Sequence, residues 1–201
     1  MPRPGLAVLL ALLALLGLSL AATAARAQGG YHSPALGVTF PATMGGLRFV
    51  RTTDFEQRQR GLGVGVYYNN PSPFVAVDVF IYDKGGRVPS GYEPAAIQDE
   101  ARQAVADIHS VAASGLYANV KVFQGPTPCR AGGGVFQCAT LEYVRTPQGQ
   151  PAVPTRSLLL LRGAKGNFVK VRLSWPQAQD VQAEPVVERW LTELVRLLPT
   201  T

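Results

Sequence analysis

The sequence has few of the residues from which metal sites and nucleophilic centres are built. Its 201 residues include two histidines, His32 and His109, and two cysteines. The P-loop, H-E-x-x-H and G-x-S-x-G patterns are absent from it. These absences argue against the nucleotide-binding, zinc-peptidase and serine-hydrolase classes that the patterns define. We therefore expect no cofactor, no metal and no catalytic residue of these kinds.

The two histidines are poor candidates for acid–base catalysis. His109 precedes Ser110 in a predicted helix, where adjacent residues do not face each other. It also lies off the apolar stripe of that helix, so a solvated surface position is the simpler interpretation. His32 falls near the start of the mature chain, in a segment that we expect to be loosely held.

Positive charge is in modest excess and is not clustered. The net charge is +6, from 19 basic and 13 acidic residues, and no three basic residues are consecutive. Nucleic-acid binding needs a clustered basic stripe, so a nucleic-acid partner is not expected. Arg3 and Arg26 lie in the predicted signal peptide described next; without them, 17 basic residues face 13 acidic ones, a net charge of +4.

Long hydrophobic runs are absent except near the N-terminus. Arg3 is followed by an apolar run over residues 6–20 and then by Ala25-Arg26-Ala27. A basic start, an apolar core and an A-x-A site together predict a cleavable signal peptide. A membrane anchor is the alternative, but the run is short for a span of about 20 residues. We expect a signal peptide over residues 1–27, a single α+β domain over 28–201, a periplasmic or secreted location, and no later transmembrane span.

The two cysteines are nine positions apart, and Gly132-Gly133-Gly134 lies between them. In an exported chain this spacing predicts a disulfide between Cys129 and Cys138 across a turn. A metal site is the alternative, but thiolate sites usually contain close C-x-x-C pairs with further ligands.

Several short segments alternate apolar and polar residues, which is the pattern of half-buried strands. The clearest two, 62–68 and 75–82, are separated by an Asn- and Pro-rich turn, so we expect them to form a β-hairpin. The other expected strands are 38–40, 47–53, 119–124, 135–145, 156–162 and 167–175.

Two segments carry apolar residues at three- and four-residue spacing, which predicts amphipathic helices. The first lies between Pro94 and Gly115, and the second extends from Pro185 to Leu198. Short links join most of the strands, so the sheet should be largely antiparallel with the helices covering its faces. The predicted fold class is α+β: a largely antiparallel sheet covered by two helices, as an α/β/α sandwich.

This order of elements resembles the Mog1/PsbP-like sandwich. The residues that carry the resemblance are the opening Leu36-Gly37-Val38-Thr39-Phe40-Pro41 and the closing helix with Trp190 and Leu194. Small exported bacterial proteins of unknown function look similar. The resemblance implies an accessory or interaction role by analogy, and it carries over no functional residue.

The glycine string Gly61-Leu62-Gly63-Val64-Gly65 is not a dinucleotide fingerprint. That motif needs a third glycine and a following helix, whereas Val66 stands in this place and the segment continues as a strand. If Tyr68 pairs with Val75, the apolar residues of the hairpin share one face. The other face then places glycines opposite Asp78 and two aromatic residues.

This glycine face is the predicted binding site. One interpretation is that the aromatic rings fill the space above bare backbone under a helix. The other is an incompletely covered slot that binds an extended peptide or a flat apolar ligand. The residues of this slot are Gly63, Gly65, Tyr67, Asp78, Phe80 and Tyr82, with Arg58 and Arg60 near its mouth.

Three classes of function remain open. The first is a non-enzymatic binding or accessory module, whose partner is an unknown protein, peptide or small apolar ligand of the cell envelope. The second is a hydrolase that uses carboxylates, with Asp54, Glu56 and Asp78 as candidates. The third is a structural envelope protein. Arg51, together with Arg58 and Arg60, also suggests an anion site, although a solvated loop explains these charges as well.

Overall fold

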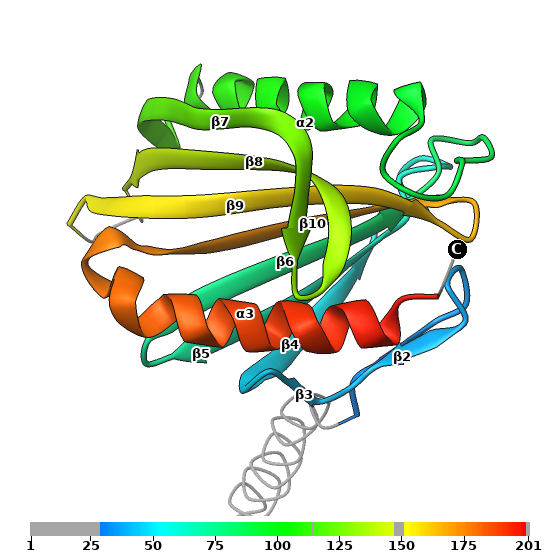
Figure 1. Cartoon of the computed structure of the whole chain (residues 1–201), viewed down its shortest axis with the longest axis horizontal. Coiled ribbons are helices and arrows are strands. Elements are labelled where there is room, and N and C mark those ends of the chain that lie inside the picture. The colour runs from blue at the N-terminus through cyan, green and yellow to red at the C-terminus, as the bar shows by residue number, and fades with distance from the viewer. Residues whose placement is uncertain (1–28, 114, 147–150, 200–201) are drawn as a thin grey trace, which may run out of the picture.

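The computed structural model describes residues 29–113, 115–146 and 151–199, and Figure 1 shows an antiparallel sheet with a helix on each face. Eight strands form the sheet in the order β3-β4-β5-β6-β10-β9-β8-β7, and β1 pairs separately with β2. This confirms the predicted α+β sandwich. The elements are β1 (Tyr31–Ser33), β2 (Val38–Phe40), β3 (Thr43–Met44), β4 (Leu47–Asp54), β5 (Val64–Pro71), β6 (Phe74–Tyr82), α2 (Ala95–Ala113), β7 (Tyr117–Ala131), β8 (Gly134–Arg145), β9 (Val153–Ala164), β10 (Asn167–Pro176), the 3-10 turn η1 (Gln177–Gln179) and α3 (Asp180–Leu197).

The main core lies between the sheet and α3. Strand pairing aligns Val66, Val79, Val171 and Leu160 in one row across four neighbouring strands, and all four are buried. Trp190 of α3 is completely buried in the same cluster. The strict alternation of apolar residues in β6 and β10 therefore has a direct cause, because one face of each strand meets this helix.

The opposite face is only partly covered. Helix α2 packs against β7, β8 and β9, and its apolar stripe contains Ile97, Ala101, Ala104 and Ile108. In Figure 1 this helix lies along the β7 edge of the sheet. On the same face, α2 reaches β6 and β10 at one end, where Tyr82 and Phe168 pack against Ile97 and Ala101, and it has no substantial contact with β4 or β5 among the described residues. None of the helices in these residues is long and apolar enough to cross a membrane.

The predicted hairpin register is wrong by two residues. Tyr68 pairs with Val77 rather than with Val75, and Gly65 therefore lies opposite Phe80. The reason is a tighter turn, because pairing continues to Pro71 and Phe74 and leaves two residues between the strands. A shift of two keeps every side chain on its predicted face.

Three other local features differ from the expectation: the segment around His32, the end of β7 and the start of α3. His32 belongs to β1 and its Nδ1 lies 3.1 Å from Oγ1 of Thr39, so this segment is tied to β2. Strand β7 continues through Cys129 instead of ending at residue 124, because it pairs with β8 along that length. Helix α3 begins at Asp180 and includes Pro185 in its second turn, where the missing N–H removes one helical hydrogen bond.

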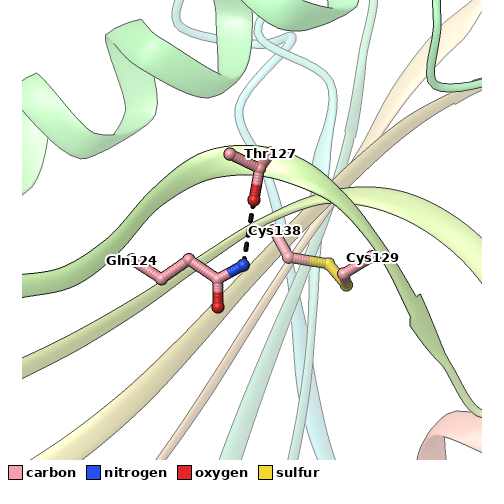
Figure 2. Close-up of a disulfide and its surroundings, with 4 residues drawn as sticks. All are labelled: Gln124, Thr127, Cys129 and Cys138. Carbon is pink, nitrogen blue, oxygen red and sulfur yellow. Dashed lines mark hydrogen bonds between the residues drawn. A yellow bond between two sulfur atoms is a disulfide. The ribbon is translucent and has the colours of Figure 1, made fainter.

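The predicted disulfide is confirmed. Cys129 and Cys138 join β7 to β8 with a Cα–Cα distance of 5.8 Å. The pairing of β7 with β8 is irregular between Val122 and Thr127, and Gln124 donates a hydrogen bond of 2.9 Å to Thr127 at this bend. Figure 2 shows the disulfide beside the bend. The bond therefore holds the hairpin together just beyond the point where its regular pairing is interrupted.

Candidate functional site

The candidate site is the part of the α2-side face that the helix leaves uncovered. We call it the open face. Apart from the buried Gly65, its residues are half-buried rather than fully exposed. They come from β4, β5, β6 and β10, and they are Thr53, Gly65, Tyr67, Ala76, Asp78, Phe80, Lys170, Arg172 and Ser174.

A charged row crosses this face. Strand pairing places Arg51, Tyr67, Asp78 and Arg172 side by side on four neighbouring strands. The guanidinium carbon of Arg51 lies 4.0 Å from the centre of the Tyr67 ring, within the range of a cation–π contact. Asp78 therefore lies between two arginines that approach from opposite sides of the face.

The next row contains Gly65, Phe80 and Lys170. The Tyr67 ring folds back over the bare backbone of Gly65, where a Cβ would lie only 2.5 Å from the tyrosine oxygen. Tyr67 also meets Phe80 edge to face, with ring centres 6.2 Å apart. Gly65 is thus needed because an aromatic ring approaches its backbone closely, as predicted for this face. The ring belongs to Tyr67 on the same strand, whereas the prediction placed the ring on the neighbouring strand.

Two charged groups on the open face lack close polar partners. Burial raises the pKa of the Asp78 carboxyl, although Arg172, Arg51 and Arg145 act in the opposite direction. Burial likewise lowers the pKa of the Lys170 ammonium, against the attraction of Glu100 and Asp107. Within the described residues, neither Asp78 nor Lys170 has a hydrogen bond or an ion pair. The Lys170 nitrogen instead lies 5.2 Å from the Phe80 ring and 5.3 Å from the Tyr82 ring.

Arg172 is held more firmly than Lys170. Its Nε donates to Ser157 and its Nη1 to Tyr117, both at 3.3 Å. The guanidinium also lies 5.1 Å and 5.3 Å from the rings of Tyr117 and Tyr143. Its Nη2 is buried without a hydrogen-bond partner in the described structure. These contacts fix a cationic side chain beside Asp78.

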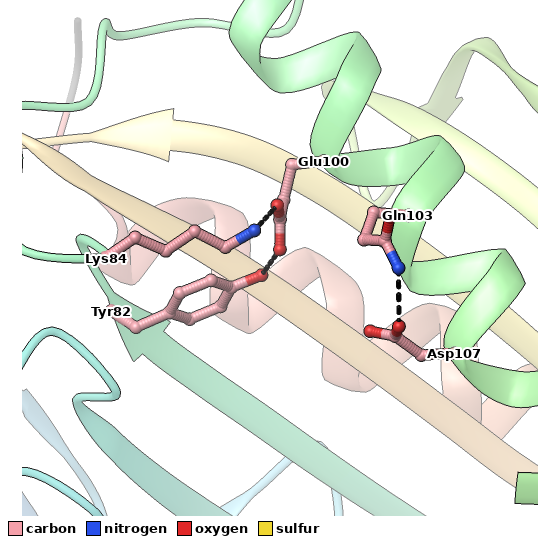
Figure 3. Close-up of polar contacts among 5 residues, drawn as sticks. All are labelled: Tyr82, Lys84, Glu100, Gln103 and Asp107. Atoms are coloured by element: carbon pink, nitrogen blue, oxygen red, sulfur yellow. Dashed lines mark hydrogen bonds and ion pairs between the residues drawn. The ribbon is translucent and has the colours of Figure 1, made fainter. Parts of the chain in front are cut away.

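Tyr82 was predicted to line the open face, but it does not. Its ring is buried, and its hydroxyl donates a hydrogen bond of 2.5 Å to Oε1 of Glu100 on α2. Lys84 pairs with the other oxygen of Glu100, and Figure 3 shows both contacts beneath the helix. Burial and Glu100 raise the pKa of Tyr82, so its hydroxyl stays protonated. Tyr82 therefore marks where α2 begins to cover the sheet, while Phe80 remains half-buried.

Gly63, Arg58 and Arg60 lie in or beside the loop between β4 and β5. Arg58 lies 5.9 Å from the Phe55 ring, which is 6.4 Å from the Phe80 ring, so this loop borders the open face. The backbone N–H groups of Gly61 and Gly63 donate to the Glu56 carboxylate at 2.7–3.0 Å. Gly63 and Arg60 line a separate pocket of about 420 Å³ near the ends of the strands. The residues of the predicted slot are thus divided. Gly65, Tyr67, Asp78 and Phe80 come together on the open face, Gly63 and Arg60 line the separate pocket, and Arg58 lies beside Phe55 at the border of the face.

Two of the three carboxylates considered for hydrolysis, Asp54 and Glu56, stabilise this loop. Asp54 accepts hydrogen bonds from the Glu56 N–H at 2.9 Å and from Gln57 at 3.2 Å. Glu56 in turn accepts the two glycine N–H groups, so both side chains hold the backbone between β4 and β5. Among the described residues, no group of three or more His, Cys, Asp or Glu side chains is placed to hold a metal ion.

The sequence did not reveal Lys170 and Arg172 as candidates. They occupy outward positions of a strand with strict alternation, and such positions are usually solvated. Their importance depends on strand order, because β10 lies beside β6 in the middle of the sheet. Clustering of cations and aromatic residues across strands distant in sequence is the feature that would have shown them.

Comparisons with known proteins leave the family open. No protein-family model matches this chain, and no curated protein matches it. Among solved structures, the chain is similar to LpqN of Mycobacterium tuberculosis, described as involved in cell envelope biogenesis. That similarity has 10% identity, covers 72% of this chain and 75% of LpqN, and has a TM-score of 0.39. This TM-score is too low to support an inference about fold family or function. The Mog1/PsbP resemblance therefore remains a prediction.

Proposed function

We propose that this chain is an exported, non-enzymatic binding or accessory module of the cell envelope that holds its ligand on the open face. The N-terminal charge, apolar run and A-x-A site support export. The disulfide between Cys129 and Cys138 supports an oxidising compartment, where such bonds persist.

The observation that carries this proposal is the composition of the open face. A sheet face without a ligand needs only polar side chains that water can solvate. Here Asp78 and Lys170 are half-buried and lack hydrogen bonds and ion pairs within the described residues, and the rings of Tyr67 and Phe80 lie beside them in the same rows. Leaving charged groups in this state costs stability, and functional sites are the usual places where proteins retain such a cost.

The test is ligand capture with variants of the open face. The mature protein is incubated with envelope extract, and bound small molecules and proteins are identified by mass spectrometry. Phe80→Ser should lose the ligand, because Phe80 contributes the half-buried ring at the centre of the face. Phe123→Ser is the matched control, since Phe123 is 62% exposed on β7 and belongs to another surface.

A ligand that is retained equally by the wild type and by a folded Phe80→Ser protein would contradict this site. Export is tested separately, by N-terminal sequencing of the protein from its native compartment. The mature chain should begin at Gln28, and an uncleaved cytoplasmic product would contradict export. Residues 1–28 lie outside the described part of the structure.

A further inference from the structure

A small pocket continues the open face toward one end of the sheet. Along β10, Arg172 is followed on the same face by Ser174 and then by Pro176, and Ser174 pairs with Ala76 of β6. Ser174 and Pro176 line a pocket of about 190 Å³. The pocket therefore begins next to the row that contains Asp78 and Arg172.

The pocket has apolar walls. They include Phe74, Val153, Trp175 and Pro176. An apolar cavity of about 150 Å³ in another protein accepts benzene, so this space admits an apolar group of about that size. Apolar side chains around an accessible space of this kind favour a ligand that removes them from water.

One cation lies beside these walls. Arg145 also lines the pocket, its side chain is exposed, and it has no hydrogen bond or ion pair within the described residues. A guanidinium offers five N–H donors in a plane that matches a carboxylate or phosphate. Arg172 and Arg51 lie farther along the open face. Together with Lys170 they give the open face beside the pocket a positive excess over its carboxylate, Asp78. A second carboxylate, Asp180, accepts a hydrogen bond of 2.7 Å from Trp175 and is neutralised by its ion pair with Arg156.

We propose that the pocket binds a small amphipathic anion, in which a carboxylate or phosphate is joined to an apolar group about the size of benzene. The apolar group enters between Phe74, Val153 and Pro176, and the anionic group lies on the guanidinium of Arg145. This inference rests on the proposed function, because it names the class of ligand that the open face and its pocket hold.

The direct test compares three probes on the mature protein by ligand-observed NMR and by tryptophan fluorescence, which Trp175 makes sensitive to the pocket. Phenylacetate has both parts of the proposed ligand, 2-phenylethanol replaces the anion with a hydroxyl, and acetate lacks the ring. A charge-assisted hydrogen bond should make phenylacetate bind about tenfold or more tightly than 2-phenylethanol. Acetate should bind more weakly than both. Equal binding of phenylacetate and 2-phenylethanol, or of phenylacetate and acetate, would overturn the proposal.

Variants assign the two parts of the ligand. Arg145→Gln should reduce phenylacetate affinity about tenfold and leave 2-phenylethanol unchanged, because only the anionic contact is lost. Phe74→Ala should weaken both aromatic probes. Arg130→Gln is the matched control, since Arg130 is an exposed arginine on β7 that does not line the pocket. Unchanged phenylacetate binding by Arg145→Gln would also overturn the inference.

The two proposals fail in different ways. If capture from envelope extract depends on Phe80 but phenylacetate does not bind, the open face remains supported as a binding site, and the proposed class of ligand is wrong. If phenylacetate binds through Arg145 but no envelope ligand depends on Phe80, the pocket is supported and the proposed function of the open face is wrong.

Discussion

The hydroxyl of Tyr82 on β6 donates a hydrogen bond of 2.5 Å to the Glu100 carboxylate on α2. Glu100 is only 6% exposed, and Lys84 pairs with its second oxygen. A buried carboxylate is tolerated only when its oxygens have such partners. This pair of residues therefore fastens α2 to the sheet at the border of the open face.

The first prediction follows from this contact. Tyr82→Phe should lower the free energy of unfolding by about 1–3 kcal/mol, because it leaves one oxygen of a buried carboxylate without its donor. Urea denaturation at pH 7 measures the change. Tyr31→Phe is the control, since Tyr31 is half-buried and donates to no carboxylate among the described residues. An equal, small effect of both substitutions would show that the Tyr82 contact contributes little.

The periodicity of the sequence was sufficient to predict the faces of the sheet but not the register of its hairpin. Valines at every second position of β6 had to point toward one side, and they do. A shift of two residues preserves that alternation, so the pattern cannot distinguish Val75 from Val77 as the partner of Tyr68. The length of the turn decides it, and turn length is poorly encoded where several Asn and Pro residues are consecutive.

The candidate site was predicted in part for a related reason. Gly65, Tyr67, Asp78 and Phe80 belong to one hairpin, so local pairing brings them together. Arg172 reaches them only because β10 returns to pair with β6, after more than 80 intervening residues. Glu100 was not recognised because a charged residue beside the apolar stripe of a helix is usually exposed. Here it is buried because it accepts a hydrogen bond from Tyr82.

The second prediction concerns the disulfide. Replacing Cys129 and Cys138 together by serine should cost about 2.5 kcal/mol in the chain-entropy model for a loop of this length. Cys138 is buried in the main core, so an added serine hydroxyl there increases the loss. Chemical denaturation of the oxidised wild type and the double variant measures it. Thiol titration of the unreduced wild type should find no free sulfhydryl, and two free thiols would contradict the bond.

The third prediction separates two reasons for glycine in this chain. Gly63 and Gly37 both have positive φ angles, +66° and +70°, but only Gly63 is crowded. A Cβ at Gly63 would lie 1.8 Å from the Ile81 carbonyl oxygen, whereas a Cβ at Gly37 meets no atom within 4 Å. Gly37→Ala should cost about 1–2 kcal/mol from the left-handed backbone alone.

Gly63→Ala should cost more than about 4 kcal/mol or prevent folding, because backbone must move. Thermal and chemical denaturation of the two purified variants compares them. This also means that a larger side chain at Gly63 tests folding and cannot serve as a test of ligand binding. Similar stabilities of the two alanine variants would show that the crowding at Gly63 is relieved easily.

The fourth prediction concerns Asp78 and uses the direction of its pKa shift. Burial raises the pKa of this carboxyl in the folded protein, and the three nearby arginines offset only part of that effect. A raised pKa means that folding is favoured when Asp78 is protonated, and that this contribution is lost as the pH rises through the folded pKa. At pH 7, well above the pKa of an aspartate in the unfolded chain, Asp78 therefore reduces the stability of the fold.

Asp78→Asn should consequently increase the free energy of unfolding at pH 7, by about the 0.5–2 kcal/mol typical of single stabilising substitutions. The gain should disappear below about pH 4, where the aspartate is also uncharged in both states. Urea denaturation across this pH range measures it, with Glu184→Gln on the exposed side of α3 as the control, since Glu184 has no side-chain hydrogen bond or ion pair within the described residues. Loss of stability at pH 7 would mean that attraction to Arg172 and Arg51 outweighs burial. A gain would show that the chain keeps a destabilising carboxylate at the centre of the open face, which is the behaviour of a binding residue rather than of one that holds the sheet together.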